Sequence, residues 1–383
     1  MKKLFLLLLG IIVFSACHHD DPTPSAEDTR TVLAYMGGDE LTSDLNQNIA
    51  DMVQGYSEVS EGNNFLIYMD DEVTPTLYRL EKNSSGVIEK KVIKTYSNQI
   101  SVDPAVINRV FTDAFSAYPA QSYGAIFSSH GTGWIPATKK VQVKSFGSDN
   151  GYQIDIVEMA SVLENITSKF KRLDFLLFDA CYMGEVEVAY EFKDCTNYII
   201  AAPTEIWAPG FPYKQIMKYL FDSQYYFQKI PEQFFDYYNF TYENRTLNST
   251  IAMIKCSEMV NLATVTKKII AAHPLEFYTI VPSGIQLYDR YDSSSHFSYD
   301  FGQLIESIAT PVEWTSFKNQ LNAVVVYKAA TNFTGTYLSI DPNHFSGLGT
   351  YIPKASQKTY INFFKTLSWF EASGWDQTAW GAN

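Results

Sequence analysis

Positively charged residues are scarce in this sequence, and they form no long run. The chain of 383 residues carries 29 Lys and Arg against 42 Asp and Glu, which gives a formal net charge of −13. A protein that neutralises a phosphate backbone needs clustered basic side chains. The sequence therefore excludes nucleic acid as an expected partner.

Cysteine is also rare, and its spacing is not that of a metal site. The chain has four cysteines, with no CxxC pair and no HExxH motif. A structural zinc or a zincin centre has no support, so we expect neither a metal nor another cofactor. Cys195 and Cys256 remain open as a disulfide or as two buried thiols, because sequence alone does not decide their pairing.

A hydrophobic run long enough to span a bilayer is missing as well. The longest apolar stretch, Leu4 to Phe14, follows two lysines and precedes Cys17, which is typical of an export signal. Phe14 to Cys17 resembles the lipobox of bacterial lipoproteins, in which the cysteine is acylated. We expect a signal peptide over residues 1–17, a lipid on Cys17 and a flexible tether over residues 18–28.

Two acidic residues, Asp20 and Asp21, lie in this tether. They resemble the signals that send lipoproteins to the surface of some Gram-negative bacteria. We therefore expect a protein of the cell envelope, lipid-anchored to the outer membrane, at the cell surface or on the periplasmic face. We also expect a monomer.

After the tether the chain alternates short apolar stretches with amphipathic ones. Strand-like segments are Thr31–Met36, Asn64–Met69, Tyr123–Ser128, Leu173–Phe178 and Tyr198–Ala202. Helical patterns fill the intervals, and residues 76–96 are typical of an inserted hairpin. The rhythm predicts an α/β fold whose mostly parallel sheet is covered on both faces.

The alternation of strand-like and helical segments becomes indistinct after about residue 256. We expect a main domain over residues 29–255 and a mainly helical C-terminal subdomain over residues 256–383. A late strand, Gly349 to Ile352, is expected to rejoin the main sheet.

Reactive side chains follow three of the predicted strands: Asp70 and Asp71, His130, and Asp179 with Cys181. Functional groups gather at the carboxyl ends of parallel strands, and neighbouring strands lie about 4.8 Å apart. His130 and Cys181 are therefore expected to face one crevice although 51 residues separate them. This is the arrangement that nucleophilic cysteine catalysis requires.

The residues around this pair fit the same chemistry. Cys181 precedes a predicted helix that begins at Glu185, whose N-terminal N–H groups and dipole would favour the thiolate. Gly131 leaves its backbone N–H open, so the N–H groups of Gly131 and Cys181 are candidates for an oxyanion hole.

Two motifs carry a resemblance to a known family. His130-Gly131-Thr132-Gly133-Trp134 and Asp179-Ala180-Cys181-Tyr182-Met183-Gly184 resemble the signature motifs of the clostripain family of cysteine peptidases, in the caspase-like clan. Further matches extend from Arg30 to about Pro353. The resemblance implies a caspase-like three-layer sandwich and an endopeptidase in which Cys181 is the nucleophile and His130 the acid/base. Its partners would be protein or peptide substrates.

Many family members cleave after Arg or Lys through acidic residues of the S1 pocket, which binds the substrate side chain (P1) preceding the cleaved bond. Asp179 is the candidate here. This chain departs from the family at Phe211, where relatives place an Asp after Pro-Gly. A desolvated cation needs a carboxylate partner, so the preference for a basic P1 residue stays open in this chain. Glu205 is the candidate to replace the carboxylate that is missing at position 211.

Relatives are also activated by self-cleavage, for which Lys139, Lys140 and Lys144 are candidates, and some need calcium. The acidic turn at Asp70 and Asp71 is oxygen-rich, but such turns are usually only solvated.

Two other readings stay open. One is a surface lipoprotein that keeps the fold and only binds peptide. The other is a glycan-processing lipoprotein, which would need two carboxylates facing one groove.

Overall fold

The computed structural model describes residues 29–37, 41–71, 73–136, 146–222, 227–241, 249–290, 295–331, 333–334 and 338–382. The expectations for residues 1–28, including Cys17, and for Lys139, Lys140 and Lys144 fall outside these ranges. No helix within these ranges has the length and apolar character needed to cross a membrane.

A nine-stranded sheet forms the centre of the molecule, in the order β12-β10-β9-β8-β5-β1-β2-β3-β4. Its strands are β1 (Arg30–Met36), β2 (Asn64–Met69), β3 (Thr76–Lys82), β4 (Ile88–Thr95), β5 (Ser122–Ser128), β8 (Leu173–Asp179), β9 (Thr196–Ala201), β10 (Thr250–Lys255) and β12 (Val325–Ala330). The five strands from β9 to β2 pair in parallel, and the remaining pairs are antiparallel.

Three small ribbons stand apart from this sheet: β6 (Phe146–Asp149) with β7 (Tyr152–Ile154), β11 (Tyr299–Asp300) with β15 (Gly349–Thr350), and β13 (Phe333–Thr334) with β14 (Leu338–Ser339). The helices are α1 (Thr42–Gly55), α2 (Pro104–Ala117), α3 (Ile156–Lys169), α4 (Val186–Glu191), α5 (Tyr213–Ile216), α6 (Lys229–Asp236), α7 (Met259–Ala272), α8 (Pro274–Thr279), α9 (Phe301–Glu306), α10 (Pro311–Val324), α11 (Lys358–Phe364), α12 (Ser368–Ala372) and α13 (Ala379–Ala382).

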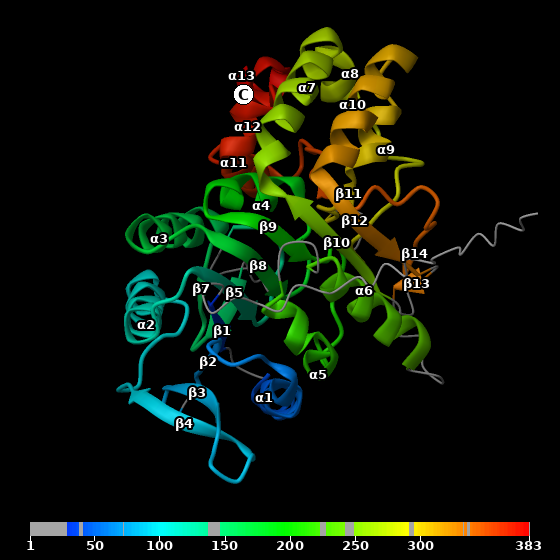
Figure 1. Cartoon of the computed structure of the whole chain (residues 1–383). Helices are drawn as coiled ribbons and strands as arrows, with labels where there is room; N and C mark the ends of the chain where they lie inside the picture. The colour runs from blue at the N-terminus through cyan, green and yellow to red at the C-terminus, as the bar shows by residue number, and fades with distance from the viewer. Residues whose placement is uncertain are drawn as a thin grey trace, which may run out of the picture.

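Helices cover both faces of the sheet (Figure 1). Strand β1 shows why its sequence is apolar throughout: Leu33 and Tyr35 belong to the core under α2 and α3, while Val32, Ala34 and Met36 belong to the core under α1, α5 and α6. A strand whose two faces are both buried has no polar side of its own. The three-layer α/β prediction is confirmed, and the five predicted strands and the hairpin are present.

The second half of the chain differs from expectation in its strands. The predicted late strand is wrong as a sheet member, because β15 pairs with β11 outside the central sheet. Two other strands, β10 and β12, extend the sheet in antiparallel pairing. Helices α7 to α13 gather at one end of the molecule (Figure 1) and share the core under α2 and α3.

Cys195 and Cys256 are two free buried thiols and form no disulfide. Burial is the largest cause that raises the pKa of each to about 12. Both are therefore inert core residues at neutral pH.

Candidate active site

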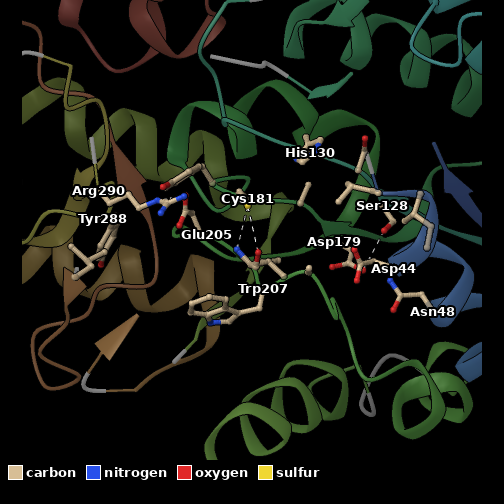
Figure 2. Close-up of a pocket in the computed structure, with 18 residues that line it drawn as sticks. Asp44, Asn48, Ser128, His130, Asp179, Cys181, Glu205, Trp207, Tyr288 and Arg290 are labelled. Atoms are coloured by element: carbon tan, nitrogen blue, oxygen red, sulfur yellow. Dashed lines mark hydrogen bonds and ion pairs between the residues drawn. The ribbon is translucent and has the colours of Figure 1, made fainter. Parts of the chain in front are cut away.

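The register between β5 and β8 places His130 and Cys181 opposite one another. Ser128 and Asp179 pair directly at the carboxyl ends of these neighbouring parallel strands. His130 and Cys181 each lie two residues further along. Both side chains line one cavity of about 390 Å³ (Figure 2).

The backbones of the two loops are in close contact. A Cβ atom on Gly131 would come within 2.6 Å of the carbonyl oxygen of Cys181 and 3.2 Å of its nitrogen, so only glycine fits there without a shift. Among the described residues, neither the N–H of Gly131 nor that of Cys181 donates a hydrogen bond. Both donors are therefore available to an oxygen that develops charge beside the thiol.

A second contact fixes the turn after the cysteine. Tyr182 adopts a left-handed backbone with φ of 60°, which is uncommon for a residue other than glycine. Its N–H donates to the carbonyl of Thr204, and its ring packs edge-on against Phe297. Gly133 also has positive φ, and a Cβ there would meet the Tyr182 carbonyl at 2.7 Å. Backbone strain of this kind persists where the surroundings enforce it.

Trp134 anchors the histidine loop to the C-terminal part of the chain. Its side chain is fully buried, with ring centroids 4.6 Å from Tyr351 and 5.8 Å from Phe364. The part of the chain after residue 256 therefore holds the loop that carries His130.

The thiol of Cys181 contacts the loop that follows β9. The N–H of Ile206 donates to Sγ over 3.4 Å, and Sγ lies 3.6 Å from the carbonyl oxygen of Ile206 (Figure 2). Burial, only partly offset by that N–H, raises the pKa of Cys181 to about 12. The expected effect of the helix N-terminus on the thiolate is opposed here by this burial. Helix α4 has six residues and begins only at Val186, so desolvation outweighs its dipole.

Asp179 is a buried carboxylate at the floor of the cavity. Its Oδ2 accepts hydrogen bonds from the hydroxyls of Tyr213 at 2.7 Å and Ser128 at 3.3 Å and from the N–H of Phe211 at 3.4 Å. Burial raises its pKa to about 6, against the opposing effect of these bonds. The group is mostly ionised above neutral pH and protonated below pH 5.

Phe211 and Glu205 are placed differently from each other. The ring of Phe211 is buried and packs on Phe234 with centroids 4.4 Å apart, away from the cavity lining. Glu205 lines the cavity but forms a 2.8 Å ion pair with Arg290. Figure 2 shows this pair on the opposite side of Cys181 from Asp179. Glu205 is therefore not positioned to replace the missing carboxylate beside Asp179, and it stays a candidate for a substrate contact elsewhere in the cavity.

Several lining residues were missed from the sequence. Asp44 and Asn48 reach the cavity from α1, one helical turn apart, and Tyr288 and Arg290 reach it from the C-terminal part. One feature could have indicated Asp44 and Asn48: helix α1 follows the carboxyl end of β1, the edge of the sheet where the site lies.

The acidic turn after β2 shows ordinary local bonding. Oδ1 of Asp71 accepts from the N–H groups of Val73 and Thr74, and Asp70 accepts from the hydroxyl of Tyr68. Within the described ranges no three His, Cys, Asp or Glu side chains gather in a metal-binding group.

The known proteins that match this chain belong to one family. A model of the clostripain family matches residues 34–380. Clostripain from Hathewaya histolytica is 26% identical over 216 residues, which are 49% of this chain and 41% of that protein. The match thus spans about two fifths of that relative's length.

Two solved structures are similar over nearly the whole chain. A secreted C11 cysteine protease from Bacteroides thetaiotaomicron, in complex with an irreversible peptide inhibitor, has a TM-score of 0.81 and 32% identity, covering 91% of this chain and 100% of the other. An inactive zymogen C11 protease from Parabacteroides distasonis has a TM-score of 0.79 and 30% identity, covering 92% of this chain and 99% of the other.

Proposed function

The chain belongs to the clostripain family of cysteine peptidases, and we propose that it is an endopeptidase in which Cys181 is the nucleophile and His130 the acid/base. The main support is the pairing of Ser128 with Asp179 at the ends of two neighbouring strands. His130 and Cys181, each two residues further along, therefore line one cavity.

The chemistry starts from a neutral thiol. On substrate binding His130 takes the proton of Cys181 while Sγ attacks the scissile carbonyl. The N–H groups of Gly131 and Cys181 hold the oxyanion. The imidazolium of His130 then protonates the leaving amine, and the acyl-enzyme forms. His130 next removes a proton from water, which attacks the thioester and releases the acid and the thiol.

The substrate class we propose is peptide with a basic P1 residue. Asp179 supports it, because a buried carboxylate in the cavity beside the nucleophile is a partner for a desolvated cation. Because position 211 is Phe and not an acidic residue, the preference for a basic P1 residue depends on other residues.

We further propose self-processing and lipid anchoring. A zymogen among the similar structures and the lysines at positions 139, 140 and 144 support the first. The lipobox-like segment ending at Cys17 supports the second, with the protein held in the outer membrane. Loss of the chain from the membrane fraction in a Cys17→Ser variant tests the anchor. Retention there would contradict it.

The test of the activity is a peptide library with every P1 residue, incubated with the wild type and with Cys181→Ala in parallel. We expect cleavage by the wild type with a defined P1 profile and none by the variant. Peptide binding without any cleavage by the wild type would favour the non-catalytic reading instead.

A further inference from the structure

One end of the cavity is built from helix α1 and the floor residue Asp179. Asp44 and Asn48 lie on the same side of Cys181 as Asp179, and all three line the cavity (Figure 2). The two helix residues are four positions apart, so they share one face of α1. This end of the cavity thus carries two carboxylates and one carboxamide.

Asp179 uses only half of its hydrogen-bonding capacity inside the protein. Oδ2 takes the three bonds from Tyr213, Ser128 and Phe211, while Oδ1 accepts none from the described residues. The backbone leaves room for the carboxylate: Gly210 has φ of +65°, and a Cβ there would lie 2.4 Å from Oδ2. Asp179 is 6% exposed and lines the cavity, so its second oxygen is available there to a cation that enters.

Asn48 is the second buried polar group at this end. It is 3% exposed, and its carboxamide makes no hydrogen bond within the described part of the chain. Buried amides nearly always have a partner. Because Asn48 lines the cavity, its carboxamide is available to hydrogen-bond a ligand there.

Asp44 stands where the helix meets the cavity. It is half-buried in the first turn of α1 and makes no ion pair with any residue that the structure describes. In contrast, Glu205, a third carboxylate of the cavity lining, is already paired with Arg290. Asp44 is therefore a carboxylate with its charge available to a cation that enters beside Asp179.

We propose that Asp44 and Asn48 complete the S1 pocket, with Asp44 supplying the second carboxylate in place of the one that Phe211 does not provide. The inference rests on the proposed peptidase function. The P1 cation enters between Asp44 and Oδ1 of Asp179, and the carboxamide oxygen of Asn48 accepts one of its N–H donors. Helix α1 therefore determines the charge that the enzyme accepts at P1.

The test compares the full-chain wild type with three variants on three peptides that differ only at P1, which is Lys, Arg or norleucine. The variants are Asp44→Asn, Asp44→Glu and a matched control, Asp51→Asn. The control removes the same charge two turns further along α1, outside the cavity lining. We expect Asp44→Asn to lose about 10- to 100-fold in kcat/KM on the basic peptides, as for one charge-assisted hydrogen bond, with little change on norleucine.

The outcomes separate this inference from the function on which it rests. No cleavage of any peptide by the wild type removes the peptidase proposal itself. A second outcome is that the wild type cleaves while Asp44→Asn keeps the same ratio of kcat/KM between the Lys and norleucine peptides as Asp51→Asn. That result overturns only the assignment of Asp44. Recovery of the basic preference in Asp44→Glu supports a charge effect, and equal loss in that variant contradicts it.

Discussion

The hydroxyl of Tyr213 donates a 2.7 Å hydrogen bond to Oδ2 of Asp179, two residues before Cys181. Tyr213 follows the Pro-Gly-Phe-Pro turn after β9, so the bond ties this turn to the floor of the cavity. The bond stabilises the ionised form of a carboxylate that burial would otherwise neutralise.

Tyr213→Phe should shift the acid side of the pH profile upward for substrates with a basic P1. Without the hydroxyl the pKa of Asp179 rises further above its value of about 6, so less carboxylate is ionised at pH 6 to 7. The measurement is kcat/KM against pH with the P1 Lys peptide. Tyr238→Phe is the control, since its hydroxyl donates to the carbonyl of Gly210 instead. Superimposable profiles for both variants would refute the role of this bond.

Gly133→Ala should reduce activity far more than stability. The added Cβ would meet the Tyr182 carbonyl at 2.7 Å and push the histidine loop away from the cysteine loop. A shift of about 1 Å between reacting groups costs on the order of 100-fold in rate. Gly151→Ala is the matched control, because its φ is also positive but no atom lies within 4 Å of the added Cβ. Equal activity in the two variants would show that the loop contact does not position His130.

The thiol of Cys181 should react as a neutral thiol in the free enzyme. With a pKa of about 12, its rate of alkylation by iodoacetamide rises about tenfold per pH unit from pH 6 to 9. Mass spectrometry of the modified peptide measures this rate, with Cys181→Ala as the control for the buried Cys195 and Cys256. A plateau below pH 8 would indicate a preformed thiolate and contradict the proposed proton transfer on substrate binding.

Glu185→Gln should raise the melting temperature more at pH 8 than at pH 5. Burial, with a smaller contribution from Glu187, raises the pKa of the fully buried Glu185 well above its usual range. The native state then binds the proton more tightly than the unfolded chain, so this carboxyl lowers stability as the pH rises above about 4.5. The cost is about 1.4 kcal/mol per pH unit until the native pKa is reached.

Glutamine does not ionise, so the cost disappears in the variant. Thermal unfolding from pH 5 to 8 measures the effect, with the surface substitution Glu61→Gln as control. A gain that is independent of pH would show that Glu185 is not a neutral buried acid.

The parts of the site that could be predicted from the sequence are those that follow directly from the order of strands and motifs along the chain. Apolar strands ending in His130 and Cys181 could be recognised because parallel strands bring their carboxyl ends together. The pairing of Glu205 with Arg290, 85 residues later, depends on tertiary placement that no local pattern contains. The same holds for Asp44, since its role depends on which face of α1 meets the cavity. The raised pKa of Cys181 was missed because burial at a site follows from packing and not from residue order.

The most direct test of the pairing of Cys181 with His130 is a crystal structure of the full chain after reaction with a peptidyl acyloxymethyl ketone that has Lys at P1. We expect a covalent bond from the probe to Sγ of Cys181, with the imidazole of His130 on the same rim and within hydrogen-bond reach of the adduct. A probe attached elsewhere, or a His130 ring too distant to share the bound peptide, would contradict it.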